Sequence, residues 1–185
     1  MYFEQEGLAL IWRNRNETLK ITPWGEDSFR VQSALVGDIV DTRYALLDPP
    51  DALSVEIVIG EKAASIRNGR MTAKVEMDDW HQYARLSFYN DQGELLIRET
   101  SPANALSLKA RKFEPYLGGD FALTVTFDAQ DGERIYGMGQ YQEEILDWKG
   151  CTLELAHRNS QASVPFYISS RGYGFLWHNP AIGQV

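Results

Sequence analysis

Hydrophobic and polar residues alternate with a period of two along much of this chain. Four runs show the alternation most clearly, at 71–77, 84–89, 106–111 and 121–127. Their apolar positions are Met71, Ala73, Val75 and Met77; Ala84, Leu86 and Phe88; Leu106, Leu108 and Ala110; and Phe121, Leu123, Val125 and Phe127. Successive side chains of a strand point to opposite faces, so each run predicts a half-buried β-strand.

Short turn signals separate the runs. Asn68-Gly69 predicts a tight hairpin because both residues tolerate a positive φ. Asp91-Gln92-Gly93 and Asp131-Gly132 divide later runs in the same way. Roughly a dozen strand candidates joined by such turns favour an all-β, antiparallel β-sandwich. We expect one domain over residues 1–185, in which the stretch 47–51 is an internal connection, and a single short helix at 141–148.

Charge and cysteine content narrow the classes of partner and compartment. The chain carries 18 Lys and Arg against 26 Asp and Glu, a net charge of −8. That charge argues against binding to nucleic acid or to an anionic membrane. The single cysteine, Cys151, permits no internal disulfide, and the N-terminal residues hold no uninterrupted apolar stretch. We therefore expect a cytoplasmic protein.

Several familiar chemical sites are absent from the sequence. It contains neither a phosphate-loop motif nor a nucleophile elbow, and His81, His157 and His178 lack the close spacing of zinc ligands. We therefore expect no cofactor and no metal. Gly137-Met138-Gly139 lacks the third glycine of a dinucleotide site, so it predicts a strand that bends or lets another backbone approach closely.

No pair of carboxylates has the arrangement that glycoside hydrolysis requires. Asp78 and Asp79 are adjacent in an expected strand, so they point to opposite faces and cannot flank one bond. Asp38 and Asp41 are the other nearest pair in the sequence. We therefore assign no catalytic residue to this chain.

The segment His157, Arg158, Asn159, Ser160, Gln161 is the strongest candidate for binding a ligand. It places an imidazole, a guanidinium, two amides and a hydroxyl in consecutive positions, and these groups can read sugar hydroxyls. An ordinary polar hairpin loop would have the same composition. Tyr141, Trp148 and Trp177 could stack on a sugar ring, although aromatic residues beside strands are more often part of a core.

Three segments, in order, resemble the N-terminal domain of glycoside hydrolase family 31. Tyr136-Gly137-Met138-Gly139-Gln140 is similar to the family's Y-G-[LFM]-G-[EQ] strand. Leu146-Asp147-Trp148-Lys149-Gly150 is similar to the segment that follows it. Residues 164–179, which run from Val-Pro-Phe through Ser-Ser-Arg-Gly-Tyr-Gly to Trp-His-Asn, are similar to the family's final hairpin.

This resemblance implies a β-sandwich like the galactose mutarotase fold. It implies the N-terminal accessory domain of a retaining α-glycosidase that acts on non-reducing-end α-xylosides or α-glucosides. The two catalytic aspartates would lie on a (β/α)8 barrel that follows the domain and is absent from this chain, so the fragment alone would be inactive. The barrel and an α-linked oligosaccharide or glycoside are the implied partners, and a homo-oligomer of the full-length enzyme is compatible with the resemblance.

In the family, one loop of this domain reaches the mouth of the active site. The loop precedes the Val164-Pro165-Phe166 strand, so the resemblance assigns substrate binding to His157, Arg158, Asn159, Ser160 and Gln161. Many relatives carry an Arg-Asp pair and a longer loop here, and the resemblance matches Asn159 to that Asp. The short loop is most similar to the bacterial α-xylosidase and α-glucosidase branch.

Two other functions stay open at this point. A stand-alone carbohydrate-binding β-sandwich would use Tyr141, Trp148 and Trp177 as a stacking platform. A mutarotase-like epimerase would follow from fold analogy alone, and it would need a His or Glu acid/base set that the scattered His81, His157 and His178 do not suggest.

Overall fold

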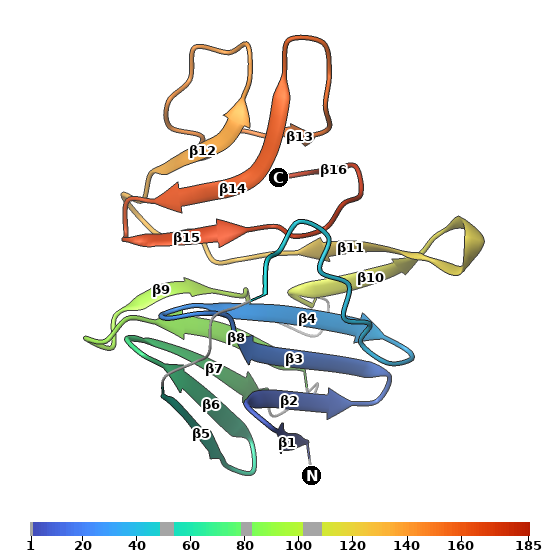
Figure 1. The fold of residues 1–185 in the computed structure, drawn as a ribbon, viewed down its shortest axis with the longest axis vertical. Helices are drawn as coiled ribbons and strands as arrows, with labels where there is room; N and C mark the ends of the chain where they lie inside the picture. Colours follow the sequence, from blue (N-terminus) through green and yellow to red (C-terminus); the bar gives the residue numbers. More distant parts are fainter. Residues whose placement is uncertain (1, 49–53, 79–82, 102–108) are drawn as a thin grey trace. The chain divides into compact units, whose positions relative to one another are not determined.

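The computed structural model describes residues 2–48, 54–78, 83–101 and 109–185, and their regular structure is almost entirely β (Figure 1). The paired strands run antiparallel. The predicted all-β, antiparallel class is therefore confirmed. The chain forms two compact units, residues 1–128 and 129–185. The expectation of one domain over 1–185 stays a prediction, because two compact units can be parts of a single domain.

Two larger sheets and a short strand pair build the first unit. The four-stranded sheet has the order β1 (Phe3–Glu6), β2 (Ala9–Asn14), β3 (Glu17–Pro23), β4 (Phe29–Leu35). The five-stranded sheet has the order β5 (Val55–Ile59), β6 (Ala63–Asn68), β7 (Met71–Met77), β8 (Ala84–Tyr89), β9 (Leu95–Arg98). The short pair is β10 (Arg111–Pro115) and β11 (Phe121–Val125), joined through the 3-10 turn η1 (Leu117–Gly119).

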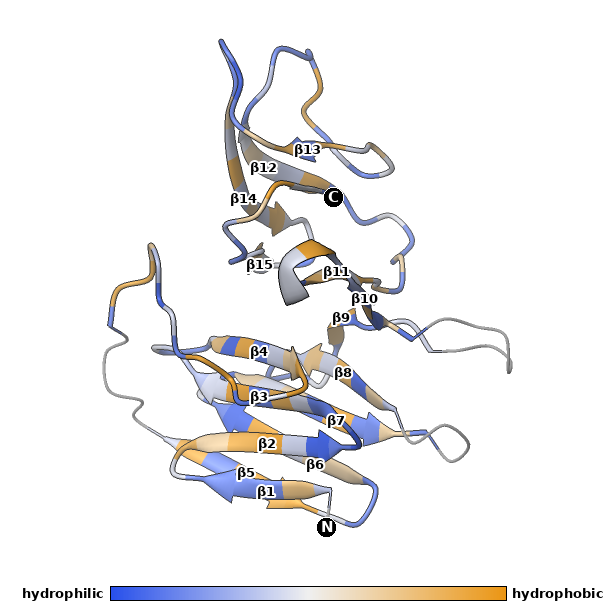
Figure 2. Cartoon of the chain, turned by 90° about the vertical axis from the view of Figure 1, so that its right-hand side faces the viewer, coloured by the Kyte–Doolittle hydropathy of each residue, from blue (hydrophilic) through white to orange (hydrophobic). Residues whose placement is uncertain are grey.

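The core of the first unit lies between the four-stranded and the five-stranded sheet. Leu19 and Ile21 contribute from β3, and Ile66 and Val75 contribute from β6 and β7, all at 1% exposure or less. Burying one such side chain contributes about 1.5–3 kcal/mol. The two sheets therefore form the layers of the predicted sandwich. The hydrophobic colouring along β2 reflects an unbroken buried run, Ala9–Trp12, rather than alternation (Figure 2).

Local patterning located two strands of the five-stranded sheet accurately. The runs at 71–77 and 84–89 coincide with β7 and β8. The run at 121–127 becomes β11, which ends at Val125, and Phe127 then pairs with Glu99 in an isolated bridge. Leu106 and Leu108 of the remaining run, and part of the 47–51 connection, lie outside the described residues.

The predicted hairpin at Asn68-Gly69 exists, but its turn lies one residue later. Asn68 pairs with Met71, so Gly69 and Arg70 form the two-residue loop, and Gly69 has φ +56°. A glycine with positive φ at the first loop position suits a II′ hairpin turn. The Asn68 side chain instead donates to the carbonyls of Gly25 at 2.7 Å and Ser28 at 2.9 Å.

The other two predicted turns are confirmed. Residues 91–92 form the turn between β8 and β9, and Gly93 follows with φ +78°. Asp131 and Gly132 form a turn ahead of β12, and Gly132 has φ +71°.

The second unit is built from two small sheets. The three-stranded sheet has the order β12 (Ile135–Gln140), β14 (Ala162–Ser169), β15 (Tyr173–Leu176), and the two-stranded sheet pairs β13 (Glu154–Leu155) with β16 (Gly183–Gln184). Its core holds Met138, Leu153 and Leu155, with half-buried aromatic residues packed around them.

The predicted helix at 141–148 is wrong. This segment has no helical structure, and its last two residues hydrogen-bond to Ile135, the first residue of β12. Trp148 N donates to Ile135 O at 2.8 Å, and Ile135 N donates to Asp147 Oδ1 at 2.9 Å. The first bond uses the Trp148 backbone N–H, which a helix would have paired within the segment. The donated hydrogen bonds from Ile135 and then Lys149 also lower the pKa of Asp147 below its usual value.

Candidate functional site

The five predicted site residues form a tight turn that leads directly into β14. Arg158 and Gln161 pair in an isolated antiparallel bridge, and Gln161 N donates to Arg158 O at 3.1 Å. Asn159 and Ser160 occupy the tip, where Ser160 has φ +65°. A non-glycine residue in the left-handed region is uncommon and is held there by its surroundings. The short loop predicted ahead of the Val164-Pro165-Phe166 strand is therefore present; we call residues 157–161 the polar turn.

Most side chains of the polar turn are exposed to solvent. His157, Arg158, Asn159 and Ser160 are exposed, and Gln161 is half-buried. Arg158 forms an ion pair with Glu154 of β13, which links the turn to the two-stranded sheet. The turn thus brings all five predicted residues together, and their contact with substrate stays a prediction.

The strand beneath the polar turn is bent by the Gly137-Met138-Gly139 sequence. The β12–β14 register shifts between Gly137 and Gly139, as in a β-bulge, and all three residues have positive φ, at +109°, +70° and +99°. A Cβ on Gly139 would lie 2.1 Å from Ala162 O and 2.7 Å from Val164 N. The expected bend and close backbone approach are both confirmed. Bulges of this kind often lie beside functional sites.

The aromatic residues that could have formed a sugar platform serve the core of the second unit. Tyr141, Trp148 and Trp177 are half-buried against Met138, Leu153 and Leu155. The rings of Tyr141 and Trp148 meet at 64° with centroids 5.6 Å apart. Trp148 Nε1 donates to Gly137 O at 3.2 Å. Because the Tyr141 and Trp148 rings are tilted against each other, and all three side chains pack on the core, they are poorly placed to act as one stacking platform.

A buried carboxylate that the sequence did not single out ties this unit together. Glu133 Oε1 accepts from the hydroxyls of Ser169 at 2.6 Å and Tyr173 at 2.7 Å, and Oε2 accepts from Lys149 Nζ at 2.8 Å. Burial alone would raise the pKa of Glu133, but these three donors outweigh it and lower the pKa. Burial also raises the pKa of Tyr173, and the bond to Glu133 adds to that rise.

Asp41 and Asp38 are the carboxylates considered for catalysis whose surroundings the structure describes in detail. Asp41 is bound to Arg30 and also lies near Arg43, and the hydrogen bond from Arg30 lowers its pKa. Asp38 is exposed. Asp79 lies outside the described residues, as does His81 among the histidines.

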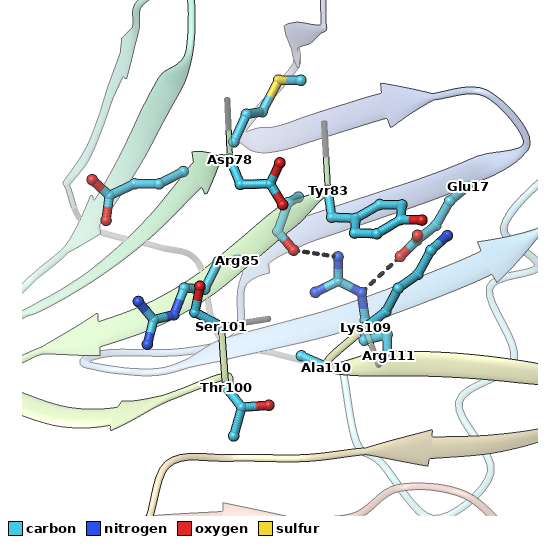
Figure 3. A pocket seen from close by; sticks show the side chains of 12 residues that line it. Glu17, Asp78, Tyr83, Arg85, Thr100, Ser101, Lys109, Ala110 and Arg111 are labelled. Carbon is cyan, nitrogen blue, oxygen red and sulfur yellow. Dashed lines mark hydrogen bonds and ion pairs between the residues drawn. The ribbon is translucent and has the colours of Figure 1, made fainter. Parts of the chain in front are cut away.

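The first unit contains a cavity of about 250 Å3, lined by charged residues of both signs (Figure 3). Arg111 is buried there between two carboxylates, with Nε 2.7 Å from Glu17 Oε1 and Nη1 2.6 Å from Glu99 Oε1. Lys109 Nζ lies 4.0 Å from the ring centroid of Tyr83. The guanidinium is already paired on both sides, as in a structural ion network.

Neither a metal cluster nor a membrane-spanning helix occurs in the described part of the chain. No group of three or more His, Cys, Asp or Glu side chains there could hold a metal ion. No helix within those ranges is long and apolar enough to cross a bilayer.

Residues 18–185 match the family model described as the glycosyl hydrolase 31 N-terminal galactose mutarotase-like domain. This chain belongs to that family. The motifs that suggested the family all fall in the second unit, on β12, the segment after it, and the β14–β15 hairpin.

Relatives of this family 31 domain are considerably longer proteins. An uncharacterized family 31 glucosidase of Pseudescherichia vulneris is 42% identical over 194 residues, which cover 96% of this chain and 36% of that protein. Alpha-xylosidase A of Aspergillus niger is 29% identical over 204 residues, covering 100% of this chain and 27% of that protein. The chain therefore spans about a third or less of the length of these relatives.

A solved structure agrees with this assignment. A family 31 α-xylosidase from a soil metagenome, crystallised with xylose, superposes on this chain with a TM-score of 0.90 at 40% identity. The match covers 100% of this chain and 29% of that one. The predicted mutarotase-like sandwich is thereby confirmed.

Proposed function

We propose that this chain is the N-terminal domain of a retaining α-glycosidase that hydrolyses non-reducing-end α-xylosides or α-glucosides. One observation carries the proposal: the family match extends over residues 18–185, and relatives at 40–42% identity are named as an α-xylosidase and a glucosidase. The hydrolytic carboxylates would lie on a following catalytic domain. The domain described here would then contribute to substrate binding rather than to bond cleavage.

We assign the polar turn to the rim of the substrate pocket. This assignment is supported by the side chains of the turn, which are exposed and can hydrogen-bond to the hydroxyl groups of a sugar. The turn itself is closed by the bridge between Arg158 and Gln161. The turn is held from two sides, by the Arg158–Glu154 ion pair and by the close β12–β14 contact at Gly139. A binding group that is fixed before the substrate arrives loses less conformational entropy on binding.

Substitutions in the polar turn test this role in the full-length protein. Arg158→Ala and Asn159→Ala should each lower kcat/KM for an aryl α-xyloside or α-glucoside at least tenfold, about 1.4 kcal/mol of transition-state binding. The thermal midpoint should change little, because both side chains are exposed. Gln92→Ala, in the exposed turn between β8 and β9, is the matched control and should leave kcat/KM unchanged. Wild-type kcat/KM in both polar-turn variants would contradict the assignment.

The alternative of a stand-alone carbohydrate-binding module has less support. It requires Tyr141, Trp148 and Trp177 as a stacking platform, and these side chains pack on the core of the second unit. For the compartment we propose the cytoplasm, on the ground that the one cysteine, Cys151, is exposed and free.

A further inference from the structure

The three-stranded sheet of the second unit exposes one of its faces. Residues on β14 alternate in burial, with Val164, Phe166 and Ile168 on the exposed side at 49%, 40% and 53%. Leu176 of β15 pairs with Phe166 and is 43% exposed. We call these four residues the outer face.

The exposed side of β14 is more apolar than the solvated face of a sheet usually is. An antiparallel sheet with one wet face normally places apolar residues inward and polar residues outward. On β14 the inward positions are Ser163, Pro165, Tyr167 and Ser169, and the two serines are 9% and 2% exposed. The outward positions are all apolar: Ala162, Val164, Phe166 and Ile168. The exposed side of this strand therefore has the composition of a buried one.

The strand register extends this apolar surface without adding a charge. Tyr136 and Gly174 are the partners of Ile168, and Gln140 is the partner of Ala162. The Phe166 ring covers Gly174, since a Cβ there would lie 2.9 Å from Phe166 Cζ. An apolar surface without charged strand residues, and with an aromatic residue at its centre, is typical of the buried centre of an interface.

We propose that the outer face is the surface on which the catalytic domain of the same polypeptide packs. This inference rests on the proposed function, and it adds the face that makes the contact. Length supports that occupant, because this chain corresponds to only 36% and 29% of two relatives that it matches closely, which leaves a large remainder to be packed. The lack of charge argues for an apolar partner surface, which a covalently attached domain can present permanently.

Hydroxyl-radical footprinting of the full-length protein tests this directly. Phe166 and Phe121 have nearly equal exposure in this chain, at 40% and 39%, so they form a matched pair. If the catalytic domain covers the outer face, Phe166 should be oxidised several-fold more slowly than Phe121. Equal oxidation rates would overturn the proposal. Protection of Phe166 that disappears on dilution, together with a dimer in sedimentation, would assign the face to a second copy and also overturn it.

A pair of substitutions gives an independent reading in the same protein. Val164→Lys and Val58→Lys place the same charge at strand positions of similar exposure, 49% and 56%. Only Val164→Lys should lower the thermal midpoint by several degrees and speed proteolytic separation of the domains. Equal behaviour of the two variants would overturn the docking face. Hydrolysis of α-xylosides and α-glucosides by the wild type is scored separately, so an active enzyme with an oxidisable Phe166 would refute this inference and leave the proposed function intact.

Discussion

Replacing Gly139 with alanine tests how far the close contact between β12 and β14 holds the polar turn in place. Gly139 has φ +99°, and its missing Cβ is what lets Ala162 and Val164 approach. An added Cβ would lie 2.1 Å from Ala162 O, a distance that forces the two backbones apart. Because Ala162 directly follows Gln161, any such movement reaches the polar turn.

The energetic cost follows from two separate effects. An L-residue in the left-handed region costs about 1–2 kcal/mol. Overpacking against backbone atoms that cannot rotate away adds about 1–3 kcal/mol. The total is about 2–5 kcal/mol, most of it localised at the β12–β14 contact.

Amide hydrogen exchange of β14 in the full-length protein measures this cost locally. Each 1.4 kcal/mol changes a local opening equilibrium about tenfold, so Gly139→Ala should speed exchange across β14 by about 30-fold or more. Gly172→Ala is the matched control, because Gly172 also has a positive φ, +84°, but its Cβ would meet nothing within 4 Å. The control should therefore show only the backbone effect, about tenfold. Equal exchange in the two variants would refute the argument from close approach.

Three further predictions concern buried polar groups, each measured by denaturant unfolding. Glu133→Gln should reduce the loss of folding stability in acid. The pKa of Glu133 is lowered in the folded protein, so the ionised carboxylate stabilises the fold fully above the ordinary pKa of 4.5, and this contribution declines as the pH falls through the lower folded pKa. An unchanged dependence of stability on pH would contradict this. Glu17→Gln weakens the pairing of the buried Arg111 and should destabilise the first unit by about 3 kcal/mol, whereas a loss below about 1 kcal/mol would show that Glu99 suffices alone. Asn68→Ala removes two buried hydrogen bonds and leaves the Gly25 carbonyl without its donor, whereas the Ser28 carbonyl keeps Trp24 N. It should cost about 2 kcal/mol, and a neutral result would contradict this.

The elements that could be predicted from sequence are those fixed by local chemistry. The strands β7 and β8 were located to the residue because alternation and turn residues act within a few positions. The bend at Gly137-Met138-Gly139 was also predictable, since two glycines so close together in a strand are needed where backbone must bend or be approached. The turn at residues 157–161 was predictable as a loop because polar residues there precede the apolar strand β14, and its role in substrate binding stays a prediction.

The misses arose where distant residues override local preference. The segment 141–148 forms no helix because Asp147 and Trp148 bond to Ile135, which lies before the segment. Asn68 is the last residue of β6 rather than part of the turn, and its side chain donates to carbonyls 40 and 43 residues away in the sequence. The partners of Glu133 lie 16, 36 and 40 residues along the chain, so no local pattern could have identified that network.

The most direct test of the central claim is an assay of the full-length protein with aryl α-D-xylosides and α-D-glucosides, with the first-formed sugar followed by proton NMR. We predict hydrolysis of one or both substrates with release of the α-anomer first, because a retaining enzyme preserves the configuration through two displacements. Initial release of the β-anomer, or no hydrolysis of either substrate, would contradict the assignment of this chain to a retaining α-glycosidase.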